Sequence, residues 1–161
     1  MSTAVSDTLI SKTIAYESHT DFSHVKPQDT QFLPGGLRDF FLYRDLGVAK
    51  ATHGKVIAHI AKANMPPDNG TGWHYHVAEF QIVIMLKGWA RFMYGETPTL
   101  VSAGDCVHQK PGIIHYLFDY SPDMEYLEIV GPADFGSIPV DGPCDVPHWA
   151  AAGSVDTHLS E

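Results

Sequence analysis

Short segments of alternating apolar and polar residues, separated by glycine and proline, make up most of this chain. The sequence holds 14 glycines and 11 prolines, and the segments between them are rich in β-branched and aromatic residues. This spacing is typical of an all-β sandwich or barrel, whereas no segment keeps the ~3.6-residue apolar period of an amphipathic helix. The pattern predicts strands at residues 40–46, 55–63, 72–76, 80–87, 89–94, 99–101, 106–109, 114–119 and 124–130.

The two ends of the chain lack this alternation. Residues 1–36 are polar with scattered apolar positions, which predicts an N-terminal arm or a short helix. Residues 137–161 are interrupted by prolines at positions 139, 143 and 147. Because proline cannot donate to a regular ladder, we expect an extended, irregular tail, with Trp149 as its contact to the body. The remaining residues, 37–136, are expected to form one barrel domain.

The amino-acid composition argues against two classes of binding partner. The chain has 161 residues, is 44% hydrophobic, and carries a formal charge of −9. This length suffices to bury about 70% of the surface of the unfolded chain without a metal or disulfide staple. An acidic surface without a basic run disfavours nucleic acid and anionic membranes as partners.

The sequence also bears on the location of the protein. Its first residues lack the basic and apolar regions of a secretion signal. The longest apolar run, residues 82–86, is far shorter than the ~18 residues of a membrane helix. With no such signal, the two cysteines, Cys106 and Cys144, are expected to be free thiols. These features predict a cytoplasmic protein.

Three histidines have the spacing of a metal centre built on neighbouring strands. Alternate side chains of a strand share one face, so His74 and His76 can point to a single ion. A third ligand has to come from another strand, and His115 is placed to supply it. Glycines bound both histidine-containing stretches. We therefore expect these residues to bind one divalent metal ion.

These stretches resemble the two motif blocks of the cupin superfamily. The first block of that family reads G-x5-H-x-H-x3–4-E-x6-G, and His74, His76 and Gly88 fall in their places. Asp68 stands at the opening glycine. Gln81 stands where the family carries a metal-ligating glutamate.

The second block, G-x5-P-x-G-x2-H-x3-N, is matched at Gly104, Gly112 and His115. Pro111 is displaced by one position, and Asp119 stands at the asparagine site. The resemblance covers residues 68–119 closely and implies a jelly-roll β-barrel. It also implies a homodimer, because cupins of this length commonly pair through their barrels.

The glutamine at position 81 changes the chemistry that the site can support. Glu79 lies too close to His76 to take the place of the missing ligand. Three neutral imidazoles then hold the ion, with Gln81 either as a fourth ligand or as a residue that orients a histidine or the substrate. With no carboxylate among the ligands, the ion keeps its full charge, which favours an anionic, oxygen-donor substrate such as the enolate of a β-diketone.

Three-histidine iron centres in cupins resemble those of the β-diketone-cleaving dioxygenases and of the thiol dioxygenases. The resemblance implies an Fe(II) dioxygenase that uses O2 to cleave a C–C bond of a small β-diketone-like or enolisable substrate, with Gln81 as a catalytic residue. Imidazole ligands also suit Zn, Ni, Cu or Mn, so two alternatives stay open. One is a zinc hydrolase or isomerase, and the other is a cupin that binds a small molecule without turnover.

Side chains alternate between the two faces of a strand, and this alternation predicts which way several other residues point. Arg91 is expected to face outward, unless a one-residue bulge turns it into the pocket as an anion anchor. Leu117 shares the parity of His115 and is expected to line the pocket, whereas Phe118 does not. Cys106 is expected to be a buried small hydrophobic residue. Structural or surface roles are expected for the remaining histidines, which are His19, His24, His53, His59, His108, His148 and His158.

Overall fold

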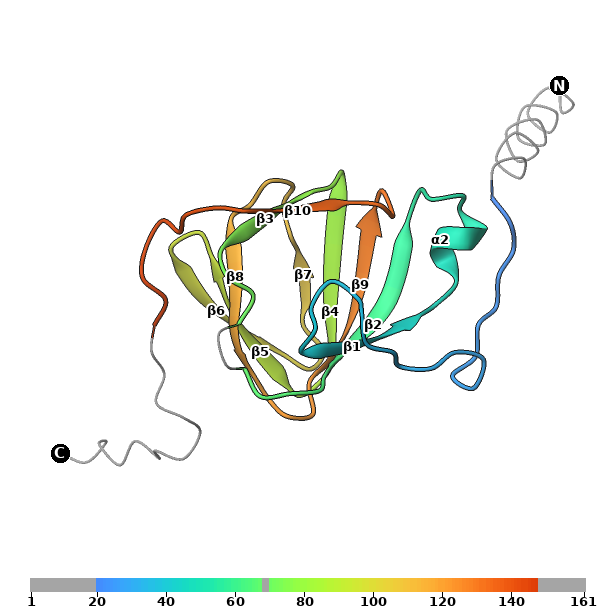
Figure 1. Ribbon diagram of the computed structural model, residues 1–161, viewed down its shortest axis with the longest axis horizontal. Coiled ribbons are helices and arrows are strands. Elements are labelled where there is room, and N and C mark those ends of the chain that lie inside the picture. The colour runs from blue at the N-terminus through green and yellow to red at the C-terminus, as the bar shows by residue number, and fades with distance from the viewer. Residues whose placement is uncertain (1–19, 68–69, 148–161) are drawn as a thin grey trace, which may run out of the picture.

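The computed structural model describes residues 20–67 and 70–147 and consists almost entirely of antiparallel strands (Figure 1). Asp68 and Trp149 lie outside the described residues. The strands are β1 (Phe41–Asp45), β2 (Ile57–Ala63), β3 (His74–Val77), β4 (Phe80–Lys87), β5 (Trp89–Tyr94), β6 (Thr97–Ser102), β7 (Cys106–His108), β8 (His115–Tyr120), β9 (Glu125–Gly131) and β10 (Gly136–Pro139). Among the described residues, no helix has the length and apolar character that a membrane span requires.

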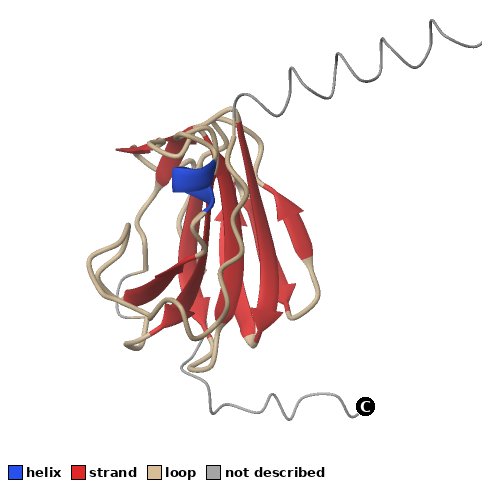
Figure 2. Ribbon diagram, turned by 90° about the vertical axis from the view of Figure 1, so that its right-hand side faces the viewer, coloured by secondary structure: helices blue, strands red, loops and turns tan. Residues whose placement is uncertain are grey.

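The strands form two sheets that face each other, which is the jelly-roll arrangement predicted from the sequence (Figures 1 and 2). Each sheet is five-stranded, one in the order β1-β2-β9-β4-β7 and the other in the order β10-β3-β8-β5-β6. Neighbours in the sheets are distant in sequence, as with β2 beside β9 and β3 beside β8. Residues from separate parts of the chain therefore meet on the inner faces.

Strict alternation along the strands builds the core between the sheets. In β4, Gln81, Val83 and Met85 point inward and are buried, while their neighbours are more exposed. The apolar core is completed by buried residues of the other strands and by one residue just before β9, namely Phe41, Ala61, Ala90, Phe92, Val101, Leu117, Tyr120 and Tyr126, with Met124 before β9. Burying these side chains against each other holds the sheets together.

The predicted strands agree with the observed ones within a few residues, and two are reproduced without change, 80–87 and 89–94. Two elements were missed. A one-turn helix, α2 (Val48–Ala51), follows β1 and lies beside β2. The prediction of an irregular tail is wrong for its first residues, because β10 pairs with β3 between Gly136↔Val77 and Pro139↔His74. Pro139 is tolerated because β10 is an edge strand.

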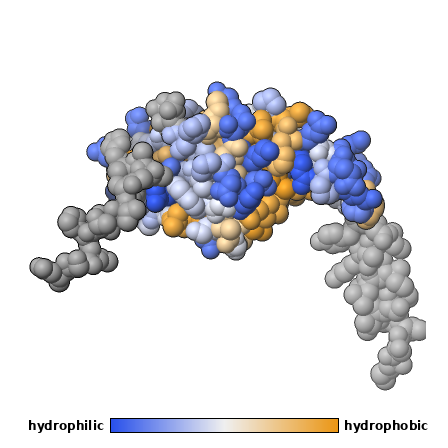
Figure 3. Space-filling view, turned by 90° about the horizontal axis from the view of Figure 1, so that it is seen from below, coloured by the Kyte–Doolittle hydropathy of each residue, from blue (hydrophilic) through white to orange (hydrophobic). Residues whose placement is uncertain are grey.

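Part of the apolar surface stays exposed. Figure 3 shows hydrophobic residues gathered in the middle of one face, with hydrophilic residues on either side. Over the described residues, the exposed large hydrophobic side chains are Phe22, Leu33, Leu37, Met65, Val77, Leu86, Leu100 and Ile138. They come from several strands and loops, so no single segment accounts for the exposed apolar area.

Candidate metal centre

Strand register brings the three predicted histidines together. His74 and His76 occupy alternate positions of β3, and His115 is the first residue of β8. His74 and His115 are directly opposite each other in the antiparallel pair. All three side chains are buried on the inner face, with exposed fractions of 4%, 6% and 4%.

The imidazoles form one compact group. The ring centroid of His74 lies 4.8 Å from that of His76 and 4.2 Å from that of His115, and 5.0 Å separates His76 from His115. One ligand nitrogen from each residue lies within 4.8 Å of the others. Among the described residues, no carboxylate or thiol is part of this group. The chain thus contains three neutral donors close enough to converge on one ion.

Burial keeps these imidazoles unprotonated. It lowers the pKa of His74 to about 3 and that of His115 to about 4. The pKa of His76 is also lowered by burial, although the charge of Glu128 and the backbone at Gly136 act in the opposite direction. A neutral imidazole has a free lone pair, which is the form that binds a metal.

Hydrogen bonds to the backbone set which nitrogen is free. Nδ1 of His74 donates to the carbonyl of Gly72, and Nδ1 of His115 donates to the carbonyl of Ile113, both at 2.9 Å. Nε2 therefore carries the lone pair in both residues. Nδ1 of His76 is buried without a hydrogen bond of good geometry. The lone pairs on Nε2 of His74 and His115, close to a nitrogen of His76, fit a divalent ion.

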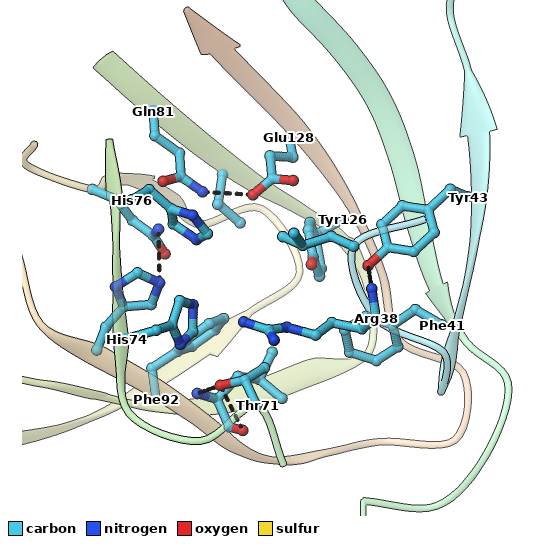
Figure 4. Close-up of a pocket in the computed structure, with 15 residues that line it drawn as sticks. Arg38, Phe41, Tyr43, Thr71, His74, His76, Gln81, Phe92, Tyr126 and Glu128 are labelled. Carbon is cyan, nitrogen blue, oxygen red and sulfur yellow. Dashed lines mark hydrogen bonds between the residues drawn. The ribbon is translucent and has the colours of Figure 1, made fainter. Parts of the chain in front are cut away.

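Gln81 lies in the same cavity, joined to a carboxylate that sequence reasoning missed. Nε2 of Gln81 donates to Oε1 of Glu128 at 2.6 Å (Figure 4). The other oxygen of Glu128 lies 2.7 Å from Nε2 of His59. The three residues come from β4, β9 and β2, neighbours in one sheet. They form a buried hydrogen-bonded row across its inner face.

Glu128 is ionised in this setting. Burial raises its pKa, but the hydrogen bond and charge of His59, together with His76 and Gln81, outweigh burial and bring the pKa below its usual value. The carboxylate lines the cavity without joining the three-histidine ligand group. The negative charge that the motif lacks at position 81 is therefore present in the neighbouring strand.

The histidines open onto a small cavity of about 30 Å³. Its lining includes the apolar residues Val83, Phe92 and Leu117, which confirms the prediction for Leu117. A volume of this size holds an ion and a few ligand atoms, since one water needs roughly 10–15 Å³ on the same measure.

The side chains of Arg91 and Arg38 point in opposite directions relative to the cavity. Arg91 faces away from the cavity, because its guanidinium donates to Asp119 at 2.8 Å and lies over the ring of Trp89. A register shift does occur between Arg91 and Phe92, but the extra residue is Phe118 of β8, so the parity of Arg91 is unchanged. Arg38, in the loop before β1, instead lines the cavity and points toward the histidines (Figure 4).

One expectation about a single residue was wrong. Cys106 is exposed on the edge strand β7, because its side chain alternates outward there. His59 has a structural role, as expected, since it is buried and bonded to Glu128. Parity indicates the burial of His59 and Glu128, since both share the inward parity of apolar residues in their strands. Arg38 has no such signal, because loops have no regular period.

The fold is a small β-barrel whose inner face carries three histidines that are placed to hold a metal ion. The cupin domain model (Cupin_2) matches residues 61–130, which include all three histidines, Gln81 and Glu128. This stretch of the chain is therefore similar to a cupin domain, and the fold is that of a small cupin.

Solved structures agree with this fold. An RmlC-like cupin protein from Ralstonia eutropha JMP134 has a TM-score of 0.56 and 19% identity, over 73% of this chain and 72% of that chain. The polyketide cyclase RemF from Streptomyces resistomycificus has a TM-score of 0.57 and 14% identity, over 76% and 89%. KdgF from Halomonas sp. has a TM-score of 0.54 and 16% identity, over 68% and 94%. At these identities the likeness concerns the fold alone, and no curated protein sequence matches the chain.

Proposed function

We propose that this chain is an Fe(II)-dependent dioxygenase that cleaves a C–C bond of a small β-diketone-like or enolisable substrate. The observation that carries the proposal is the set of three buried, neutral imidazoles without a carboxylate among them. His74, His76 and His115 would hold the ion. Bound there, Fe(II) supplies Lewis acidity toward a chelating enolate and redox reactivity toward O2.

The chain's own residues would prepare the substrate. The neutral ligand set leaves the charge of the ion uncompensated, so the anionic enolate is favoured over the neutral diketone. Phe92, Leu117 and Val83 give the cavity an apolar wall, which strengthens electrostatic interactions within it. The substrate would bind as the enolate already present in solution, its proton having passed to bulk water, so no dedicated base is required.

Gln81 would act as a fixed polar group facing the substrate or the ion. Because Glu128 can only accept, the amide nitrogen of Gln81 is the atom directed to it, and the amide oxygen is left to face the cavity. Burial raises the pKa values of Tyr126 and Tyr94, so both phenols stay protonated. Tyr94 donates to Gln109, which in turn lies 3.5 Å from Nε2 of His115.

Oxygen consumption tests this function. Protein loaded with Fe(II) under anaerobic conditions and then exposed to O2 should consume O2 only after 2,4-pentanedione or a related enolisable dicarbonyl is added. His74→Ala should abolish the uptake, whereas His53→Ala, at an exposed histidine, should not. Absence of uptake across a panel of β-diketones, enols and thiols would eliminate the dioxygenase.

A second candidate is a zinc enzyme that catalyses hydrolysis or isomerisation without O2. The buried carboxylate of Glu128 favours it, because such an enzyme needs a group that accepts a proton near the ion. Both oxygens of Glu128 are already hydrogen-bonded and its pKa is lowered, which makes it a weak base. Turnover of an enolisable ketone by the zinc form in the absence of O2 would favour this candidate over the first.

A further inference from the structure

Arg38 brings a positive charge into the metal cavity, and no ion pair links it to an acidic residue in the described part of the chain. It lies in the loop just before β1, where its backbone nitrogen donates to the hydroxyl of Tyr43 at 3.0 Å. The side chain extends into the cavity toward His74 (Figure 4). Its Nη2 atom is buried and makes no hydrogen bond with any described residue.

The carboxylate in the cavity does not satisfy this arginine. Arg38 is the only arginine or lysine, and Glu128 the only carboxylate, among the described residues that line the cavity. Glu128 uses one oxygen for Gln81 and the other for His59, and it forms no ion pair with Arg38. A guanidinium nitrogen that is buried without an anion is unfavourable, and an anionic group of a ligand bound in the cavity would satisfy it.

A bound metal ion would add positive charge to the cavity and so increase the need for an anionic ligand. The charges of Arg38 and Glu128 cancel, and the three histidines are neutral, so a divalent ion leaves the cavity with two positive charges. A ligand that carries a single enolate charge balances one of them. A second negative charge on the ligand, placed at the guanidinium, would balance the other.

We propose that Arg38 is a specificity-determining residue that pairs with a carboxylate of the substrate while the carbonyl oxygens of the substrate face the three histidines. The preferred substrate is then a dicarbonyl acid and not a neutral diketone. A guanidinium suits this role because its planar fork can bind both oxygens of a carboxylate. The second half of this proposal, the placement of the carbonyls, rests on the function proposed above.

The position of Arg38 also bears on the space for a substrate. The cavity of about 30 Å³ is small for a dicarbonyl acid, and the arginine side chain extends into it (Figure 4). Arg38 belongs to the loop before β1 and is half-buried, and its side chain would have to move when a substrate enters. A substrate carboxylate paired with it would accompany that movement and leave the inner space to the carbonyl oxygens.

Two ligands that share the same dicarbonyl group but differ in charge test the proposal. The probes are 2,4-dioxopentanoate and its methyl ester, titrated calorimetrically into the zinc-loaded protein without O2. The wild type should bind the acid more tightly than the ester. Arg38→Met should weaken binding of the acid by about 10- to 100-fold and change binding of the ester about twofold or less. Any extra chelation by the acid is the same in both proteins and cancels in the comparison.

Two control variants show whether the change in binding is specific to the charge of Arg38. Arg91→Met removes an arginine outside the cavity and should behave like the wild type, and Arg38→Lys, which keeps the charge, should recover part of the preference for the acid. Metal content and the unfolding midpoint are measured for each variant.

Equal effects of Arg38→Met on acid and ester, or no binding of the acid to the wild type, would overturn the proposal. Because no turnover is needed, Arg38-dependent binding of the acid without O2 consumption would eliminate only the dioxygenase.

Discussion

The side-chain amide of Gln81 donates a 2.6 Å hydrogen bond to the carboxylate of Glu128. Both residues are buried and lie on adjacent strands, β4 and β9, of one sheet. Position 81 is the place where a cupin usually carries a ligating glutamate. In this chain the negative charge is on Glu128, one strand away. Gln81, which stands in the place of the ligating glutamate, is hydrogen-bonded to it. We interpret the two residues as one unit, in which Glu128 fixes the orientation of the Gln81 amide.

Restoring the motif residue at position 81 should destabilise the metal-free protein. Gln81→Glu removes a hydrogen-bond donor and places two carboxylates side by side in a buried cavity, which we expect to cost about 2–3 kcal/mol at neutral pH. The repulsion raises the pKa of the new carboxyl group in the folded state. The loss of stability should therefore grow as the pH rises above the usual range for glutamate.

Urea unfolding of metal-free wild type and variant at pH 5 and pH 8 measures this effect. Gln81→Leu is the control, since it loses the same hydrogen bond without adding a charge, and its loss of stability should not grow as the pH rises. A Gln81→Glu protein as stable as the wild type at pH 8 would show that Gln81 and Glu128 are not coupled as described.

Removing the charge of Glu128 should also destabilise the protein, with the opposite pH dependence. Glu128→Gln leaves His59 and Gln81 sharing one acceptor, at an expected cost of about 3 kcal/mol at neutral pH. The pKa of Glu128 is lowered in the folded state, so its contribution is present above the usual glutamate pKa and is lost as the pH falls. The difference in unfolding free energy between the two proteins should shrink on acidification. A difference that is constant from pH 7 to pH 3 would contradict an ionised Glu128.

The buried histidines should make the metal-free protein sensitive to acid. Unfolded chains take up protons at histidine near pH 6.5, whereas the pKa values in the folded state are about 3 for His74 and about 4 for His115. The unfolded state thus binds more protons as the pH falls below about 6.5, and folding stability decreases between pH 7 and pH 4. The urea midpoint of the metal-free protein measures this decrease.

The same histidines can be tested individually for this acid sensitivity. His115→Asn removes one of the groups and should flatten the pH dependence, whereas His108→Asn, at an exposed position of β7, should leave it unchanged. An equal slope in the two variants would show that His115 titrates in the folded protein as it does in water.

Leu117 should contribute to stability as well as to the cavity wall. It is 3% exposed and contacts the core between the sheets, so Leu117→Ala should cost about 2–4 kcal/mol in the free energy of unfolding. Leu100→Ala is the matched control, because Leu100 is 57% exposed and should cost at most about 1 kcal/mol. Similar losses in both variants would contradict the inward orientation of Leu117.

The sequence was sufficient for the parts of the structure that follow a regular period. Residues 80–87 and 89–94 were predicted without error because alternation is strict there and Gly88 marks the turn between them. The three histidines were found because both motif blocks place them on strands. Cys106 was misjudged because burial at an edge strand depends on what covers it, which a local pattern does not contain.

The parts that were missed depend on contacts between distant segments. Glu128 shares the inward parity of Tyr126 and Val130, but its hydrogen-bond partners are decided by its pairing with β2 and β4. Its partner His59 is 69 residues away in sequence. β10 was missed because its pairing with β3 overrides a proline-rich composition. Homodimer formation, cytoplasmic location and the identity of the metal stay predictions.

The metal content of purified protein tests the central claim most directly. Elemental analysis should find about one divalent ion per chain in the wild type and in His108→Ala, and almost none in His115→Ala. His108 is the suitable control because it is exposed on β7 and outside the three-histidine group. Equal metal content in His115→Ala and the wild type would contradict a centre formed by His74, His76 and His115.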